Sequence, residues 1–211
     1  MKIENTKKIF NLLQQMHPHA SCELNFKSIF ELLVAVILSA QCTDRRVNII
    51  TEKLFQSYNK PSDFAYLNND DLAPMIFSCG FYSNKGKNII DASRIIHEKY
   101  SDTVPNSMEE LLALPGVGRK TASVILSVGY GIPAIPVDTH VFRVANRIGL
   151  SKGSTPNRVE KDLKELFERD NWNKLHNFLV FHGRYICKSQ KPKCDKCLLS
   201  QECFYNKSKT K

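Results

Sequence analysis

An amine, a carboxylate and a glycine-rich turn lie close together in the middle of the chain, and their residue types could act on a nucleic-acid strand. The turn covers residues 114–118 (Leu-Pro-Gly-Val-Gly), Lys120 follows it, and Asp138 comes eighteen residues after the lysine. Two glycines let backbone N–H groups approach an anion without a Cβ in the way. A lysine at the start of the next helix would be held beside that anion. The pattern therefore predicts a lysine nucleophile that attacks a sugar next to a bound phosphate.

A second group that could do chemistry is a cluster of four cysteines near the C-terminus. They are separated by six, two and five residues. Four thiolates this close can enclose a tetrahedral zinc ion or an iron–sulfur cluster. Zinc sites usually pair two Cys-x₂-Cys motifs and only one is present, which favours iron–sulfur while leaving zinc open. The predicted ligands are Cys187, Cys194, Cys197 and Cys203.

Basic residues accompany this cluster. Lys188, Lys191 and Lys193 lie between its first two cysteines, and Arg184 comes just before them. A loop held by metal at both ends would be a rigid basic finger suited to backbone phosphates. The alternative is a solvated run of charge with no ligand.

Composition agrees with a polyanionic partner. The chain has 211 residues and a formal net charge of +9, which favours nucleic acid, although a basic enzyme with a small anionic substrate has the same balance. The N-terminus has no apolar signal core, and the longest apolar run, residues 30–40, is too short to cross a bilayer. We therefore expect a cytoplasmic protein without a membrane partner. Cys22, Cys42 and Cys79 are scattered along the sequence and are expected to be inert thiols.

The elements that must position these groups are helices. Helical periodicity runs through nearly the whole chain, and few segments show the period of two that is typical of strands, so the fold class is predicted to be all-α. Residues 28–31 and 107–110 form capping boxes that begin a buried helix and a short helix leading into the glycine turn. Asp44 is expected to cap a helix that runs towards Tyr58.

The glycine turn is predicted to belong to a helix–hairpin–helix. Its second helix is expected over residues 119–130, ended by Gly131 and Pro133. Asp138 occupies the N-cap position of a helix predicted over residues 141–148. The segment 131–136 is the expected domain boundary.

Together these motifs resemble the endonuclease III family of bifunctional DNA glycosylases and abasic-site lyases. The likeness covers almost the whole chain. It includes the 6-2-5 cysteine spacing and the segments 23–26, 30–33, 38–41 with 43–44, 114–122, 137–143 and 182–185.

The resemblance implies a two-domain, all-helical helix–hairpin–helix glycosylase fold. A six-helix barrel would cover residues 22–132, and residues 133–211, completed by residues 1–21, would surround one [4Fe–4S] cluster. The protein would act as a nucleoid-associated monomer on double-stranded DNA with damaged pyrimidines or abasic sites, bound in a groove between the domains. It would remove oxidised pyrimidines and then cut the strand 3′ to the abasic site by β-elimination.

The resemblance also implies roles for single residues. Lys120, shielded from water in the groove, would form a Schiff base with the sugar, and Asp138 would offset the developing charge. Gln41 and Phe81 would fill the gap left by the displaced nucleotide. Phe81 stands where we expect a leucine, and the alternative is an ordinary anchor at a helix start. The remaining expected DNA contacts are Gly116, Val117, Gly118, Arg119, Arg184, Lys191 and Lys193.

Two other functions compete with this one. A related adenine glycosylase of A·G mismatches shares the fold and the cluster, but it lacks a lysine nucleophile, has a catalytic glutamate at the end of the barrel helix, and carries a C-terminal extension absent here. A non-catalytic iron–sulfur DNA-binding module would need the hairpin but not Lys120 paired with Asp138. Both readings are therefore less favoured than the lyase.

Overall fold

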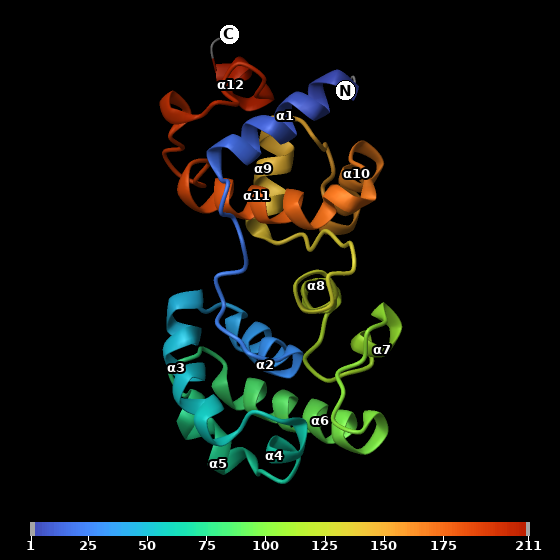
Figure 1. Cartoon of the computed structure of the whole chain (residues 1–211). Coiled ribbons are helices and arrows are strands. Elements are labelled where there is room, and N and C mark those ends of the chain that lie inside the picture. Colours follow the sequence, from blue (N-terminus) through green and yellow to red (C-terminus); the bar gives the residue numbers. More distant parts are fainter. Residues whose placement is uncertain (1–2, 210–211) are drawn as a thin grey trace. The chain divides into compact units, whose positions relative to one another are not determined.

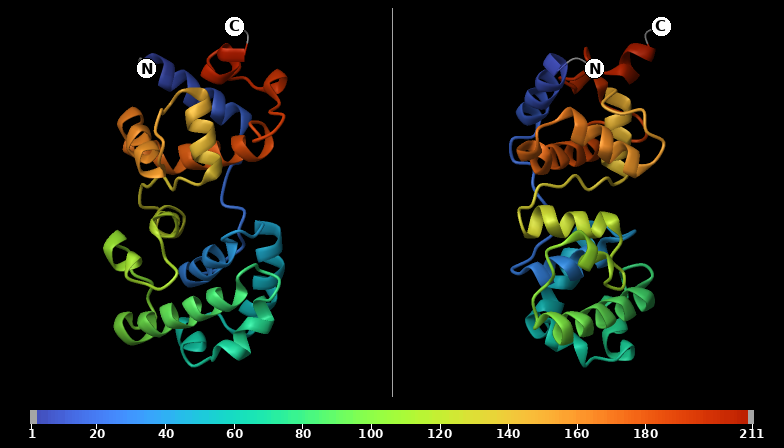
Figure 2. Two further views of the ribbon diagram at one scale, coloured as in Figure 1. Left: turned by 180° about the vertical axis from the view of Figure 1, so that it is seen from behind. Right: turned by 90° about the vertical axis from the view of Figure 1, so that its right-hand side faces the viewer.

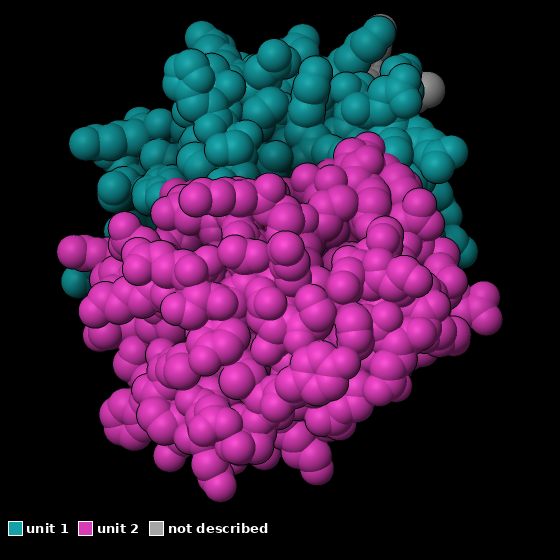
Figure 3. Space-filling view, turned by 60° about the horizontal axis from the view of Figure 1, so that its bottom comes forward, with its two compact units in different colours: residues 1–22, 133–211 teal, residues 23–132 magenta. Residues whose placement is uncertain are grey.

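The structure is a computed structural model that describes residues 3–209, all of them in helices, turns and loops (Figure 1). Among these residues there is no strand, which confirms the all-α class. Contacts divide the chain into two compact units, one of residues 1–22 and 133–211 and the other of residues 23–132 (Figure 3). No helix within the described range is long and apolar enough to cross a membrane.

The unit of residues 23–132 is built around α6, its longest helix (Figure 2). Helices α2, α4 and α5 all pack against α6. A π-helical turn over Ile125–Gly129 continues α8 directly. The α-helices are α2 (Ile29–Ser39), α3 (Asp44–Ser57), α4 (Pro61–Ala65), α5 (Asn69–Ile76), α6 (Tyr82–Tyr100), α7 (Met108–Leu112) and α8 (Arg119–Val124).

Helix α2 is the buried helix predicted from the apolar run, and residues 30–38 of it are all buried. Ser28 Oγ accepts the backbone N–H of Glu31 at 3.1 Å, as a capping box requires. The Glu31 carboxylate, however, accepts the N–H of Lys27 rather than that of Ser28. The cap therefore reaches one residue further upstream than predicted.

Helix α3 corrects another detail of the prediction. Its N-cap is Thr43, whose Oγ1 accepts the N–H of Arg46 at 3.3 Å, and Asp44 is the first helical residue. Both residue types favour a helix start, but only the residue with extended backbone can act as the cap. Asp44 instead places its negative charge in the first turn, where the helix dipole favours it.

The other unit consists of α1 (Ile3–Met16), α9 (Thr139–Ile148), α10 (Pro156–Leu166), α11 (Trp172–Tyr185) and α12 (Phe204–Lys209). Helix α9 packs against α10, α11 and α12, and α1 packs against α11. The core contains Ile9 and Leu13 of α1, which are fully buried with Val144 of α9 and Leu179 of α11. An N-terminal helix thus completes a core made mostly by the C-terminal third of the chain.

Candidate functional site: a hairpin lysine, a capping aspartate and a cysteine pocket

The glycine turn between α7 and α8 is a tight hairpin. The N–H of Val117 donates to the carbonyl of Leu114 at 3.1 Å, which closes a four-residue turn. Pro115 and Gly116 occupy its two central positions, and Gly116 has a φ of +74°. Proline followed by a residue with positive φ is the signature of a type II turn.

The two glycines of the hairpin are needed for different reasons. A Cβ on Gly116 would lie 2.8 Å from the Cβ of Asn88, so both the backbone angle and the available space require glycine there. Gly118 has a φ of −88°, and nothing lies within 4 Å of the position of its missing Cβ. Because none of the described residues other than its neighbours in the chain occupies that space, Gly118 leaves its backbone open to an external group.

Lys120 is the second residue of α8, directly behind this open turn. Arg119 and Lys120 are both exposed, and Val117 is buried beneath them as the anchor of the turn. Lys120 and the neighbouring Gly118 are thus both exposed in this structure, and the shielding of Lys120 in a DNA-binding groove stays a prediction.

The predicted helix over residues 119–130 changes character midway. Residues 119–124 are α-helical, and residues 125–129 widen into a π-turn in which the N–H of Tyr130 donates to the carbonyl of Ile125 at 3.2 Å. Gly129 lies close to α2, where a Cβ would come within 3.1 Å of the Ile29 side chain. Gly131, with a φ of +67°, then ends the segment as predicted.

Asp138 is the N-cap of α9, as predicted from its position. Its Oδ1 accepts the N–H of Val141 at 2.8 Å, and the helix begins at Thr139, two residues earlier than expected. The bond holds the partly buried carboxylate in one orientation. Asp138 belongs to the unit of residues 1–22 and 133–211, whereas Lys120 belongs to the unit of residues 23–132.

Gln41 and Phe81 occupy two turns of the same unit. Gln41 follows α2, and Phe81 immediately precedes α6; both are exposed, Phe81 to 65%. Both have left-handed backbone, with φ of 54° and 58°. A left-handed backbone is uncommon for side-chain-bearing residues and is found disproportionately at functional sites. Cysteines beside them bring the two turns into contact, because Cys42 and Cys79 lie 3.9 Å apart at their sulfurs.

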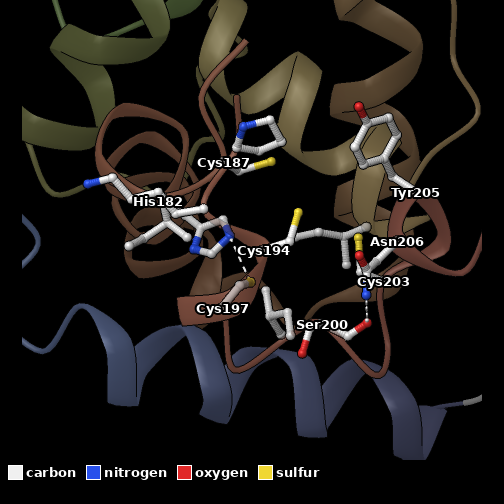
Figure 4. A pocket seen from close by; sticks show the side chains of 13 residues that line it. His182, Cys187, Cys194, Cys197, Ser200, Cys203, Tyr205 and Asn206 are labelled. Atoms are coloured by element: carbon white, nitrogen blue, oxygen red, sulfur yellow. Dashed lines mark hydrogen bonds between the residues drawn. The ribbon is translucent and has the colours of Figure 1, made fainter. Parts of the chain in front are cut away.

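The four C-terminal cysteines line one pocket, as their spacing suggested (Figure 4). The pocket encloses about 350 Å³, including space open to solvent. All four are free thiols, and the close-up shows their sulfurs around a common space. Ile148 of α9 and Leu199 complete its apolar wall. The pocket lies entirely within one unit.

The donor set of the pocket is four cysteine thiols from one short stretch of the chain. Four cysteine thiolates are the ligands both of tetrahedral zinc and of [4Fe–4S] clusters. Among the residues described, no group of three His, Cys, Asp or Glu side chains is already arranged as a metal-ion site.

Burial favours the neutral form of two thiols of the pocket, Cys197 and Cys203. Burial raises the pKa of Cys197 to about 11 and also raises the pKa of Cys203. Metal ligands must be deprotonated, so a bound metal centre would add positive charge to that of Arg147, whose guanidinium donates to the Cys187 sulfur at 3.6 Å. The donor set and its environment therefore fit a metal cofactor.

A histidine pair, not anticipated as part of the site, lies against this pocket. His182 Nε2 is 3.6 Å from the Cys197 sulfur (Figure 4), and His182 Nδ1 is 3.1 Å from Nε2 of His17. Burial lowers the pKa of His182 to about 3, with a further contribution from His17. A neutral His182 can donate one N–H to a thiolate or to its histidine partner. His182 lies in segment 182–185, one of the segments that resemble the endonuclease III family. No pattern in the sequence pointed to His17.

The basic loop after α11 is held by two arginines of α9. Arg147 donates to the carbonyls of Lys188 (2.6 Å) and Ser189 (2.9 Å), and Arg143 donates to the carbonyl of Cys187 (3.1 Å). Residues four apart share one face of a helix, which is why both arginines reach the same loop. Arg143 belonged to a recognised motif, but the role of Arg147 was missed because its partners are some forty residues away.

The predicted cations near this loop differ in exposure. Lys191 and Lys193 are exposed on the loop, and Lys191 adopts a left-handed backbone with a φ of 47°. Arg184, near the end of α11, is partly buried. Gly183 beside it allows α11 to approach α9 closely, because a Cβ there would lie 2.8 Å from that of His140. The close packing of α11 on α9 at Gly183 thus lies just before the basic loop, which follows the end of α11 at Tyr185.

Comparison with known proteins relates the chain to DNA repair. Residues 34–169 match the model of the HhH-GPD superfamily of base excision DNA repair proteins. Endonuclease III of Rickettsia conorii is 46% identical over 205 residues, which cover 97% of this chain and 98% of the relative. Endonuclease III of Bacillus subtilis is 48% identical over 189 residues (89% and 86%), and that of Escherichia coli is 42% identical over 198 residues (94% of each).

Solved structures give the same picture. A trapped endonuclease III–DNA covalent intermediate superimposes with a TM-score of 0.95 at 40% identity and covers 100% of both chains. A non-covalent endonuclease III–DNA complex also gives a TM-score of 0.95 at 40% identity. A thermostable thymine-DNA glycosylase, at 22% identity and a TM-score of 0.88, shares the fold.

Proposed function

The chain belongs to the endonuclease III family of the HhH-GPD superfamily, and on this premise we propose that Lys120 is the amine that bonds to deoxyribose in damaged DNA. Its activity is that of a DNA glycosylase and abasic-site lyase of base excision repair. The observation that supports the assignment of Lys120 is its place in the second position of α8, exposed next to the open backbone of Gly118.

The reaction begins when the nucleotide is rotated out of the duplex, at a cost of a few kcal/mol. Oxidised pyrimidines that have lost aromaticity stack poorly, so this cost already selects for them. We propose that Gln41 and Phe81 fill the vacated space, since their turns touch and both side chains are exposed. An aromatic ring at position 81 can stack on the bases next to the gap.

Lys120 then attacks as a neutral amine. Its lone pair forms a bond to C1′, the bond from C1′ to the base breaks, and the base leaves with a proton. The sugar ring then opens: the C1′–O4′ bond breaks, O4′ takes up a proton from solvent, and the nitrogen lone pair of Lys120 forms the C1′=N bond of an iminium. This cation acidifies the C2′ proton; its loss expels the 3′ phosphate and cuts the strand. Lys120 is exposed in the free protein, so bound DNA has to exclude water from it. Removal of water favours a neutral amine.

Asp138 is proposed to stabilise the positive charge that develops on the sugar and to accept protons. Its hydrogen bond from the N–H of Val141 holds the carboxylate in one orientation, so the carboxylate does not have to reorient during the reaction. The phosphates of the strand are assigned to the hairpin backbone of residues 116–119, and those further along to Arg184, Lys191 and Lys193. These contacts position the strand without reading its sequence.

We assign one [4Fe–4S] cluster to Cys187, Cys194, Cys197 and Cys203, on the basis of their common pocket and their 6-2-5 spacing in the sequence. When bound, the cluster supplies a structural cross-link; base release and elimination need no electron carrier. Double-stranded DNA with oxidised pyrimidines or abasic sites is the proposed substrate, bound by a monomer.

Borohydride trapping tests the assignment of Lys120. Reduction during turnover should link the wild-type protein covalently to a duplex that contains an abasic site, and Lys120→Gln should abolish the link. Lys53→Gln, which removes an exposed lysine from α3, is the matched control and should be trapped like the wild type. Peptide mapping that finds the crosslink on another side chain, or a fully trapped Lys120→Gln, contradicts the proposal.

A further inference from the structure

Two cysteines outside the C-terminal pocket form a pair of their own. Cys42 and Cys79 are 37 positions apart in the sequence, yet the Cys42 thiol donates a hydrogen bond to the Cys79 sulfur at 3.9 Å. These thiols, scattered along the chain, were expected to be inert. The fold places them in contact.

Both cysteines lie in turns rather than in helices. Cys42 follows α2, where its N–H donates to the carbonyl of Ser39 at 3.1 Å, and Cys79 follows α5, where its N–H donates to the carbonyl of Ile76 at 2.9 Å. A disulfide needs its sulfurs about 2.05 Å apart, so the pair must close by roughly 1.9 Å. Turn residues can supply such a movement more easily than residues within a packed helix.

The two thiols differ in access to solvent. Cys79 is fully buried, whereas Cys42 is partly exposed. Burial, together with the adjoining Cys42, raises the pKa of Cys79 to about 11. An oxidant from solvent therefore meets Cys42 first, and Cys79 is in place to react with the product.

We propose that Cys42 and Cys79 form a reversible disulfide when the protein meets a peroxide. In the first step, peroxide transfers an oxygen atom to the Cys42 thiolate, which becomes a sulfenic acid while hydroxide leaves. In the second, the Cys79 sulfur attacks the Cys42 sulfur, the S–O bond breaks, and the sulfenic oxygen leaves as water with the thiol proton. Disulfides that form transiently inside cells are typically redox-sensing.

The disulfide would join the two turns that carry Gln41 and Phe81. Each of these residues is adjacent to, or two positions from, one of the cysteines, and each has a left-handed backbone. Pulling the sulfurs together changes how both side chains are presented. This consequence, unlike the disulfide itself, rests on the proposed function: oxidation should weaken binding to a duplex with an abasic-site analogue severalfold, and a thiol reductant should restore it.

The experiment treats the full-length protein with hydrogen peroxide, without DNA, and maps its peptides before reduction. Trypsin places Cys42 in residues 28–45 and Cys79 in residues 54–85, so the predicted product is a single crosslinked pair of these peptides that reductant separates. Cys42→Ala should abolish it, and Cys22→Ser, which changes a cysteine outside the pair, should leave it intact. Brown visible absorption is followed throughout, so that damage to the metal pocket is recognised.

The outcomes separate this inference from the proposed function. Overoxidation of Cys42 with Cys79 unmodified, or crosslinks to other cysteines instead, overturns the disulfide, whatever the trapping of Lys120 shows. A disulfide that forms but leaves DNA binding unchanged overturns its effect on the turns. A crosslinked pair with weakened, reductant-restored binding in the wild type, and neither change in Cys42→Ala, supports both parts.

Discussion

At the scale of single residues, Asp138 has a structural role that can be separated from its proposed chemical role. Its carboxylate caps α9 through the N–H of Val141, and asparagine caps a helix about equally well. Asp138→Asn should therefore keep the stability of the protein within about 0.5 kcal/mol of the wild type. Because the amide carries no charge, its single-turnover rate of base release should fall by about 10²–10³-fold.

Asp138→Ala is the matched variant, because it removes the cap as well as the charge. It should lose the same activity and also about 1 kcal/mol of unfolding free energy, as measured by urea denaturation. An Asp138→Asn protein with wild-type rates would show that the residue is a cap only.

At the scale of the elements, the hairpin predicts opposite behaviour for its two glycines. Gly116→Ala introduces a side chain at a φ of +74° and 2.8 Å from Asn88, so it should destabilise the unit by about 1–3 kcal/mol. Gly118→Ala meets no protein atom and should cost less than about 1 kcal/mol, but its Cβ would occupy the space assigned to a phosphate.

Urea denaturation and DNA-binding measurements on both variants check this assignment. Gly118→Ala should weaken DNA binding while the free energy of unfolding changes little. Gly116→Ala should mainly lower the free energy of unfolding. Unchanged DNA binding by Gly118→Ala would remove the hairpin from the proposed interface.

Helix starts could also be predicted at this scale, although the N-cap of α3 was assigned to the wrong residue. Ser28 and Ser107 cap α2 and α7 as expected, because a cap depends on residues three positions apart. Thr43 and Asp44 are both good caps in adjacent positions, and local sequence could not choose between them. The π-turn after α8 was missed; it ends at Gly129, which packs against Ile29 of α2, a contact between residues far apart in the sequence.

At the scale of the whole molecule, the cysteine pocket should determine whether one unit folds. The four cysteines follow α11 and line one pocket, so a bound cluster would tie together the segments after α11. Cys197→Ser should lose iron, visible absorption and helical circular dichroism together. Iron and zinc analysis of the wild type should find four irons per chain and no zinc.

The unit of residues 23–132 has its own core and contains none of these cysteines. Limited proteolysis of Cys197→Ser should therefore degrade residues 133–209 first. A metal-free Cys197→Ser protein that stays folded and active would show that the pocket does not stabilise this unit.

The sequence alone determined what depends on neighbours along the chain. The caps at Ser28 and Asp138, the turn at Pro115 and Gly116, and the cysteine spacing all involve residues a few positions apart, whose backbone chemistry is the same in any fold. Tertiary structure decided the rest: that Arg147 holds the loop at Lys188, that His17 meets His182, and that Cys42 touches Cys79. Such pairs form only when helices pack, and packing depends on the shapes of many side chains at once, which no local pattern records.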